Sequence, residues 1–245
     1  MEHPVLQVIH AHRSIRRYKP DPVPWEMVET IVAAAQRSST SSYLQTWSVV
    51  AVTDPEKRNR LAELCGQQEH IRQAPVFLAW CADRYRLDLA CRMHALEQNT
   101  EYVEDFLVAA VDAAIAMQTA AIAAEALGLG MCFIGGIRNR PEEVIALLDL
   151  PPRVFPISGM TLGWPAEDPK PKPRLPLEAV LHRESYHRQQ EAYLRAFDET
   201  VRRAGIYRRR TGEVLGWLEV AARKAAREGR SHLRQVLEQQ GYPLR

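Results

Sequence analysis

The sequence feature that most constrains the fold is a long alanine-rich run, YVEDFLVAAVDAAIAMQTAAIAAEAL, at residues 102–127. Its apolar residues recur at helical spacing and cover most of the helix circumference, and Gly128 follows as a typical helix stop. Many alanines also let a neighbouring backbone come close, as they do in buried elements. We therefore predict a buried helix here that also reaches a subunit contact.

A membrane-spanning role for this run is not expected. Only the 12 residues of 113–124 are uncharged, between Asp112 and Glu125, whereas a spanning helix needs about 20. The N-terminal residues MEHPVLQVIHAH lack the basic start and apolar core of a signal peptide. The four cysteines form no C-x-x-C pair, which favours reduced thiols. We expect a cytoplasmic protein with no membrane partner.

Around the long run, helical patterns and strand-like runs alternate only in part. Hydrophobic residues make up 46% of the chain, enough for a sizeable core. Strand-like runs are TWSVVAVTDP, PVFLAWCAD, MCFIGG and PISGMTLGW, and helical patterns cover residues 4–12, 25–36, 55–66, 141–148 and much of 185–245. Helices outweigh strands, so the pattern predicts an α+β layered fold.

The chain is expected to divide into a core, residues 1–184, and a helical extension, residues 185–245. The core includes a proline-rich excursion at 165–176, PAEDPKPKPRLP, which cannot join a helix or a central strand. Residues 201–245 hold 11 basic and 4 acidic residues, a charge of +7 against −5 for the rest of the chain. An anionic molecule is therefore expected to approach the basic tail.

Several common cofactor signatures are missing. Gly128 and Gly130 are followed by Phe133, so the dinucleotide pattern G-x-G-x-x-G fails. No phosphate-binding P-loop, G-x-S-x-G elbow or H-E-x-x-H pair is present. His182 and His187 lack a carboxylate at ligand spacing and are predicted to be surface residues. We expect no metal site and no hydrolase chemistry.

Three segments nevertheless carry the chemistry of a phosphate site. The strip HRSIRRY places His12, Arg13, Ser14 and Arg16 at a helix end, and arginine suits phosphate oxygens. The run SSTSSYLQTW offers five small hydroxyl residues after a helix, and in KPKPRLP the prolines hold Lys172 and Arg174 on an extended backbone. Taken singly, these segments also fit a solvated strip, a capping turn and a linker.

Taken together, the motifs point to a family. HRSIRRY, the hydroxyl run followed by LQ, GLGMCFIGG, LGWPAEDPKPKPRLP and the closing QQGYPLR occur in this order. The chain resembles the oxygen-insensitive, NADPH-dependent nitroreductases and flavin reductases of the nitroreductase superfamily, in its larger group with a helical extension. The resemblance covers almost the whole chain. It implies a central, mostly antiparallel sheet flanked by helices, a C-terminal helical extension and an intertwined homodimer.

The resemblance also assigns FMN as the bound cofactor, at two sites on the subunit interface. It implies cofactor contacts from one subunit by His12, Arg13, Ser14, Arg16, Gln68, Phe133, Ile134, Gly135, Gly136, Lys172 and Arg174. It implies contacts from the opposite subunit by Thr40, Ser41 and Ser42. The resemblance also allows tyrosine at the position of Phe133, which leaves a hydroxyl contact there open. Glycines after a strand fit a close approach to a flat ring, and equally a simple turn.

In such enzymes NADPH delivers a hydride to flavin N5, and an acceptor then takes two electrons by a ping-pong scheme. No side chain acts as nucleophile or general acid, and Arg16 or Lys172 would tune the flavin by its positive charge. Arg208 is the expected contact of the NADPH 2′-phosphate. Its neighbours Arg209 and Arg210 remain alternatives, as does a solvated loop.

The acceptor itself stays open from the sequence. A nitroaromatic, a quinone, an azo compound, chromate or free flavin would each fit, and so would another reaction class on the same fold. A non-enzymatic alternative is an anion- or nucleic-acid-binding module that uses the basic tail. Against it, the basic residues are not interleaved with exposed aromatics, and Tyr207 and Trp217 are expected to be packing groups. We therefore expect no nucleic-acid partner.

Overall fold

The computed structural model describes residues 3–98 and 102–242. Residues 1–2 and 99–101 lie outside this part of the chain. So do residues 243–245, the last three of the motif QQGYPLR. Contacts divide the chain into two compact units, Met1–Pro169 with Arg230–Arg245, and Lys170–Gly229. Because these units are defined by spatial contacts, the division between residues 184 and 185 drawn from the sequence stays a prediction.

A four-stranded sheet forms the centre of the first unit, in the order β1-β2-β4-β3. Its strands are β1 (Trp47–Val52), β2 (Val76–Asp83), β3 (Gly130–Ile134) and β4 (Val154–Gly163). All three pairings are antiparallel. Every residue of β2 is buried, as expected for an inner strand covered on both faces. The antiparallel α+β prediction is confirmed.

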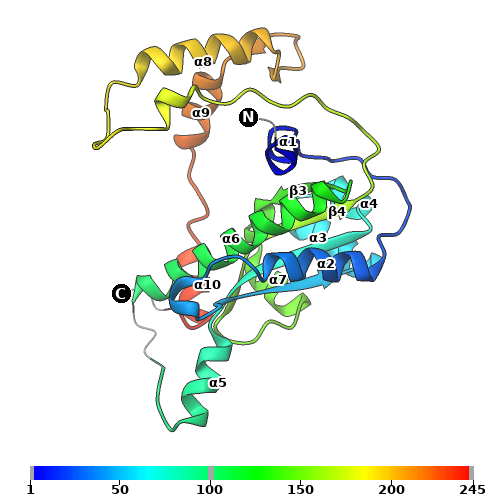
Figure 1. Cartoon of the computed structure of the whole chain (residues 1–245), viewed down its shortest axis with the longest axis vertical. Coiled ribbons are helices and arrows are strands. Elements are labelled where there is room, and N and C mark those ends of the chain that lie inside the picture. The colour runs from blue at the N-terminus through cyan, green and yellow to red at the C-terminus, as the bar shows by residue number, and fades with distance from the viewer. Residues whose placement is uncertain (1–2, 99–101, 243–245) are drawn as a thin grey trace. The chain divides into compact units, whose positions relative to one another are not determined.

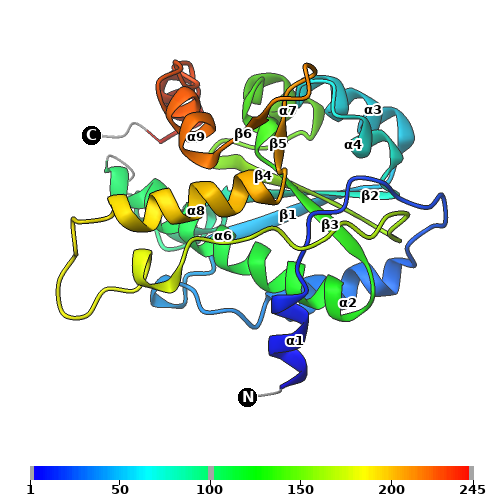
Figure 2. The same cartoon turned by 90° about the horizontal axis from the view of Figure 1, so that it is seen from above.

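Helices cover both faces of this sheet (Figure 1). The first unit contains α1 (Pro4–His10), α2 (Trp25–Ala35), α3 (Pro55–Leu64), α4 (Glu69–Gln73), α5 (Tyr85–Met93), α6 (Val103–Ala126), α7 (Pro141–Leu147) and α10 (Leu233–Gln239). Figure 2 shows α2 and α6 on one face, with α3, α4 and α7 on the other. Two buried hydrophobic clusters fill these layers, one under each set of helices.

Helix α3 shows how the sequence sets local structure. Asp54 accepts a hydrogen bond from the backbone N–H of Lys57 at 2.7 Å, and Pro55 occupies the first turn. After the helix, Gly66 takes a φ of 94°, a conformation that favours glycine. The sequence pattern for this helix is therefore confirmed at both ends.

Helix α6 presents two different apolar faces. Its small face is buried against β2, β4 and α2, through Ala109, Ala113, Ala116, Ala120, Ala121 and Ala124. On the other face Leu107, Val111 and Ile115 are 53%, 47% and 41% exposed. Their spacing of four residues makes one continuous row, which we call the α6 stripe. The predicted burial of this helix is thus correct for one face only.

Length and composition single out α6 in another respect. Within the described part of the chain it is the one helix that could cross a membrane by these measures, with a mean hydropathy of 1.8. The 12-residue count from the sequence understated its apolar length because that count stopped at Asp112. The alanine face packs into the core of the unit, so α6 serves as a core helix.

The second unit is small and mostly helical. It contains the 3-10 turn η3 (Leu177–Ala179), α8 (Glu191–Arg203), the strand pair β5 (Tyr207–Arg208) and β6 (Val214–Leu215), and α9 (Trp217–Ala225). Asp198 accepts from the backbone N–H of Leu218 at 2.7 Å and from Arg202 at 2.9 Å. Burial opposes the charge of Asp198, but these two bonds outweigh it and lower its pKa. The carboxylate thereby ties α8 to the start of α9.

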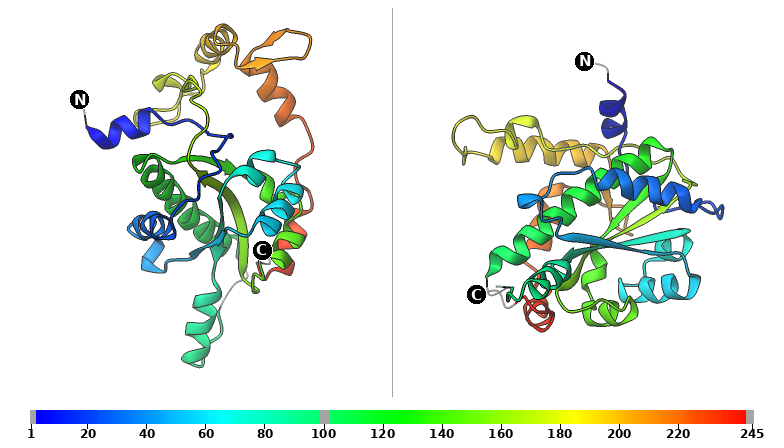
Figure 3. Two further views of the ribbon diagram at one scale, coloured as in Figure 1. Left: turned by 90° about the vertical axis from the view of Figure 1, so that its right-hand side faces the viewer. Right: turned by 60° about the horizontal axis from the view of Figure 1, so that its bottom comes forward.

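Helix α5 and this short hairpin were not predicted. Figure 3 shows α5 pointing away from the sheet, and no residue of α5 is buried. A helix without a buried face carries little hydrophobic pattern for sequence reasoning to detect. The hairpin strands have two residues each, fewer than an alternation pattern needs.

Candidate active site

The strip HRSIRRY lies against β3, held by two buried side chains. Ile15 and Tyr18 are buried, whereas Arg16 and Arg17 are exposed. The backbone N–H of Ile15 donates to Met131 of β3 at 2.9 Å. A Cβ added at Gly130 would overlap the Ile15 side chain, so the glycine permits this close approach. The strip is therefore anchored on its apolar residues and presents its polar ones.

A second segment, residues 164–167 directly after β4, is hydrogen-bonded to the strip. Lys19 donates its backbone N–H to Trp164, and Ala166 donates to Arg17, each at 2.9 Å. The backbone N–H groups of Arg16 and Arg17 both donate to one oxygen of Glu167, at 2.6 and 3.1 Å. Two segments about 150 residues apart are thus joined, as the sequence motifs suggested.

The charges of the strip are not all equivalent. His12 Nδ1 lies 2.7 Å from a carboxylate oxygen of Glu125, and Arg13 forms a 2.5 Å ion pair with Asp168. Arg13 also donates to the carbonyl of Ala11. The Arg16 guanidinium has no hydrogen-bond or ion-pair partner among residues 3–98 and 102–242. Arg16 is therefore available to bind an anion from outside its own chain.

The turn after β3 brings Gln68 to the predicted glycine segment. The 3-10 turn η2 (Gly135–Arg138) follows Ile134 directly. A Cβ added at Gly136 would overlap the Cys65 carbonyl and the Gln68 amide, so only glycine fits there. Gln68 itself donates to the Cys65 carbonyl at 2.7 Å. The structure thus unites two of the predicted flavin contacts. Phe133, next to them on β3, is half-buried.

His70 connects this turn region to the strip. Its Nε2 is buried without a hydrogen-bond partner in the described chain. Burial lowers the pKa of His70, the charge of Arg16 lowers it further, and Glu167 acts in the opposite direction. Electrostatic interaction with both residues places α4 close to the strip. The strip, the segment after β4 and the η2 turn therefore form one cluster.

The lowered pKa of His70 predicts acid sensitivity. An unfolded histidine, with a pKa of about 6.5, binds a proton at a higher pH than folded His70 does, so stability is lost as the pH falls through that value. We expect the free energy of unfolding, measured by urea denaturation, to decrease between about pH 7 and pH 5. His70→Gln should lessen the decrease. An equal decrease in both proteins would show that another group is responsible.

The run SSTSSYLQTW, residues 38–47, which we call the hydroxyl segment, has a distinctive backbone. Ser42, Tyr43 and Gln45 take φ values of 48°, 59° and 53°, a left-handed conformation that is costly for residues other than glycine. Asp112 of α6 accepts from the backbone N–H of Ser41 at 2.9 Å and from the Thr46 hydroxyl at 2.7 Å. The side-chain hydroxyls of Ser41 and Ser42 have no partner among the described residues, so they too are available to a ligand.

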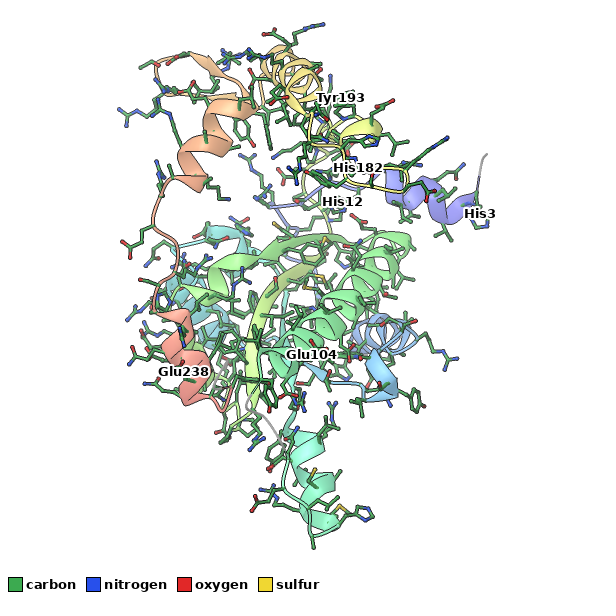
Figure 4. The ribbon with its side chains drawn as sticks, turned by 90° about the vertical axis from the view of Figure 1, so that its left-hand side faces the viewer. His3, His12, Glu104, His182, Tyr193 and Glu238 are labelled. Carbon is green, nitrogen blue, oxygen red and sulfur yellow. The ribbon has the colours of Figure 1, made fainter. Side chains whose placement is uncertain are left out.

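Within one chain, however, this segment does not join the strip. It is attached at Asp112, whereas His12 is attached at Glu125, 13 residues along the same helix. At about 1.5 Å per residue, these attachment points are about 20 Å apart. In Figure 4, Glu104 in the first turn of α6 and His12 of the strip lie well apart. The hydroxyl segment and the strip are therefore attached to two different positions of one helix, near its middle and in its last turn.

The remaining predicted residues lie in the second unit. Lys172 and Arg174 are exposed on a segment without helix or strand, as the proline pattern predicted. Arg208 donates to the Gly212 carbonyl at 3.0 Å. Arg209 pairs with Glu213 and Glu219, at 2.8 and 3.0 Å.

Four acidic residues of the first unit were missed by sequence reasoning. They are Asp112, Glu125, Glu167 and Asp168. A signal existed for Asp112, because it is the single charge within residues 106–124. A lone acid in an otherwise apolar helix indicates a buried partner. No comparable signal marks Glu167 or Asp168, which lie in an extended segment.

Metal and thiol chemistry find little support. In the described residues no three His, Cys, Asp or Glu side chains are grouped as a metal ion would require. Cys65, Cys81 and Cys91 form no disulfide. Cys65 lies nearest the η2 turn, and burial raises its pKa to about 12, so it is not a nucleophile at neutral pH.

Comparison with known families gives two matches that together span most of the chain. Residues 9–164 match the model of the nitroreductase family. Residues 172–245 match the model of the nitroreductase family, C-terminal domain.

Individual relatives cover the whole length. An FMN reductase [NAD(P)H] of Bacillus subtilis (strain 168) is 41% identical over 244 residues, 98% of each chain. An oxygen-insensitive NADPH nitroreductase of Salmonella typhimurium is 38% identical over 242 residues, 99% of each chain. The solved structure of B. megaterium NfrA2 superimposes with a TM-score of 0.96 at 38% identity, covering 100% of both chains.

Proposed function

This chain belongs to the nitroreductase family, and we propose that it is an FMN-dependent oxidoreductase that uses NADPH. Its acceptors are nitroaromatics, quinones or related compounds, reduced by two electrons. The observation that carries this function is the cluster of the strip, Glu167 and the η2 turn, with the Arg16 guanidinium left free. A flavin reductase that releases reduced flavin is equally compatible, since one similar relative is an FMN reductase.

The residues present fit FMN. Its phosphate and polar ring edge need donors, and the Ser14 hydroxyl and the Arg16 guanidinium have no partner within the described residues. Its flat ring needs a close backbone approach, which Gly135 and Gly136 provide beside Gln68. We propose that these residues hold the cofactor together with His12, Arg13, Phe133 and Ile134, and that Lys172 and Arg174 complete the phosphate cradle.

The division of labour follows from these residues. When bound, FMN supplies the redox chemistry, the two-electron exchange between NADPH and an acceptor in a ping-pong scheme. The protein contributes binding, orientation and charge. Arg16 offers a positive charge to the ring edge, and Glu167 fixes the backbone from which Arg16 projects. No side chain is needed as nucleophile or general acid.

We propose that the active form is a homodimer in which Thr40, Ser41 and Ser42 serve the partner's flavin. Within one chain they are attached about 20 Å from the strip, too far to share one phosphate with it. Thr40 and Ser41 also line a cavity of about 370 Å³ together with the α6 stripe. An exposed apolar row beside polar ligand groups suits a second copy of the chain.

Three neighbouring arginines, Arg208, Arg209 and Arg210, are candidates for the contact with the NADPH 2′-phosphate, and their ion pairs reduce the choice. Two carboxylates already neutralise Arg209, which leaves Arg208 and Arg210. Arg208→Ala is expected to raise KM for NADPH about tenfold while leaving KM for NADH nearly unchanged, because a 2′-phosphate contact is lost. Steady-state kinetics with both nucleotides measures this. Arg210→Ala is the matched control. If Arg208→Ala raises KM for NADPH and NADH equally, Arg208 does not bind the 2′-phosphate.

The alternative of a nucleic-acid-binding tail is less favoured. Three of its four acids pair with arginines, through Arg209–Glu213, Arg223–Glu219 and Arg234–Glu238. Trp217 packs edge-to-face on Phe197, with ring centroids 5.6 Å apart, as expected for a packing group. We propose a cytoplasmic enzyme without nucleic-acid or membrane partners.

Anaerobic stopped-flow spectroscopy tests the function directly. The purified protein should be yellow, and the flavin absorption band should disappear after the first mix, with NADPH. Nitroaromatic, quinone and free-flavin acceptors, added in a second mix, would then rank by the rate at which the band returns. A colourless preparation that FMN cannot reconstitute would refute the proposal.

A further inference from the structure

Helix α6 carries two carboxylates that each hold a different half-site. We propose that Asp112 and Glu125 are positioning residues, Asp112 for the hydroxyl segment of one flavin site and Glu125 for His12 of the other. This inference rests on the proposed function, because it concerns how the same flavin sites are organised. In this inference, two carboxylates of α6 fix the residues of both flavin sites in place before the cofactor binds.

Asp112 is a buried acid, and both of its carboxylate oxygens accept hydrogen bonds. Its side chain lies in the core, with the residue 1% exposed. One oxygen accepts from the Ser41 N–H at 2.9 Å. The other accepts from the N–H and the hydroxyl of Thr46, at 3.2 and 2.7 Å. Burying a carboxylate costs free energy of desolvation, which such hydrogen bonds must compensate. Here all three bonds come from one loop.

These bonds bracket the strained part of that loop. Ser41 and Thr46 flank residues 42–45, three of which have positive φ. Each such residue costs free energy that the surroundings must supply. Without the carboxylate, the loop would relax toward ordinary backbone conformations, and the hydroxyls of Ser41 and Ser42 would lose their arrangement. Asp112 therefore fixes the shape that presents them.

Glu125 acts on the other half-site through one short bond. Its side chain is 14% exposed and lies 2.7 Å from His12 Nδ1. A histidine that donates from Nδ1 to a carboxylate has its ring plane fixed, and its Nε2 is left for a different partner. No other described residue bonds to the His12 ring. Glu125 therefore decides where the Nε2 of His12 points.

The test compares four variants by titrating apoprotein with FMN. Asp112→Asn and Glu125→Ala should each raise the FMN dissociation constant about tenfold, because a charged hydrogen bond is lost at a ligand-binding segment. Glu142→Ala is the control: it removes an exposed acid of α7 that has no bonding partner in the described chain, and it should leave affinity unchanged. Thr46→Val, which removes one of the three donors, should give a smaller loss and covers the case in which Asp112→Asn does not fold.

Double-mutant cycles separate positioning from general destabilisation. If Glu125 acts through His12, adding Glu125→Ala to His12→Ala should weaken FMN binding little further. The same holds for Asp112→Asn added to a Ser41→Ala, Ser42→Ala background. Additive losses in both cycles, or unchanged affinity in the folded single variants, would overturn the inference. Wild-type protein that binds no FMN would instead refute the proposed function.

Hybrid dimers test the assignment of Asp112 to the partner's site. A dimer of one Asp112→Asn subunit and one Arg16→Ala subunit should keep one intact site, because both defects fall on the same flavin. It should bind one FMN per dimer with wild-type affinity. If Asp112 served its own subunit's strip, both sites would be weakened, and the absence of a wild-type site would exclude the proposed assignment.

Discussion

Replacing Arg16 with alanine is expected to weaken FMN binding by about 10- to 100-fold, the range for losing a charged hydrogen bond at a ligand. The reason is its availability. His12 and Arg13 are paired with Glu125 and Asp168, whereas the Arg16 guanidinium has no partner in the described chain. Any flavin still bound should also have a lower reduction potential, because the negative charge of its reduced form loses a nearby cation. Fluorescence titration and spectroelectrochemistry measure the two effects.

Arg17→Ala provides the matched control for this prediction. Arg17 is the next residue, is also exposed, and donates its backbone N–H to the same Glu167 oxygen. Removing its side chain changes the net charge by the same amount. If both variants lose affinity equally, the effect is one of overall charge. If Arg16→Ala keeps wild-type affinity and potential, Arg16 is not the ring-edge cation.

Much of the fold could be predicted because its elements carry their own signals. The helix at 102–127 has unbroken helical spacing and a glycine stop, and the structure places it at Val103–Ala126. The inner strand β2 is a continuous apolar run and is buried throughout. Such long patterns leave few alternatives. The family motifs added the antiparallel order of the sheet, which periodicity alone does not reveal.

Less of the site could be predicted, because its geometry depends on long-range contacts. The sequence shows that the strip HRSIRRY is basic, but not that Asp168 and Glu125 occupy two of its side chains and leave Arg16 free. These acids lie more than 100 residues from their partners. Likewise, no local pattern announces positive φ at Ser42 or Tyr43. Tertiary bonds from Asp112 impose it against intrinsic preference.

The second large effect concerns the subunit contact, and Leu107→Asp should abolish it. Leu107 is 53% exposed at the start of the α6 stripe and lines the same cavity as Thr40 and Ser41. If a second copy covers this row, the variant buries an unpaired charge, at a cost of several kcal/mol. The dimer should then dissociate, and FMN affinity should fall at least about 100-fold, because each flavin loses the hydroxyl segment of the partner.

Sedimentation equilibrium and FMN content, measured on the same samples, decide this prediction. Ala146→Asp is the control, since it places the same charge on an exposed position of α7 away from the stripe. A Leu107→Asp protein that remains dimeric would mean that the stripe is not the contact. A monomer that binds FMN as tightly as the wild type would mean that each site is complete within one chain. The expected joint loss of dimer and flavin follows because the two segments are attached at Asp112 and Glu125, 13 residues apart on one helix, so that one chain cannot bring them together.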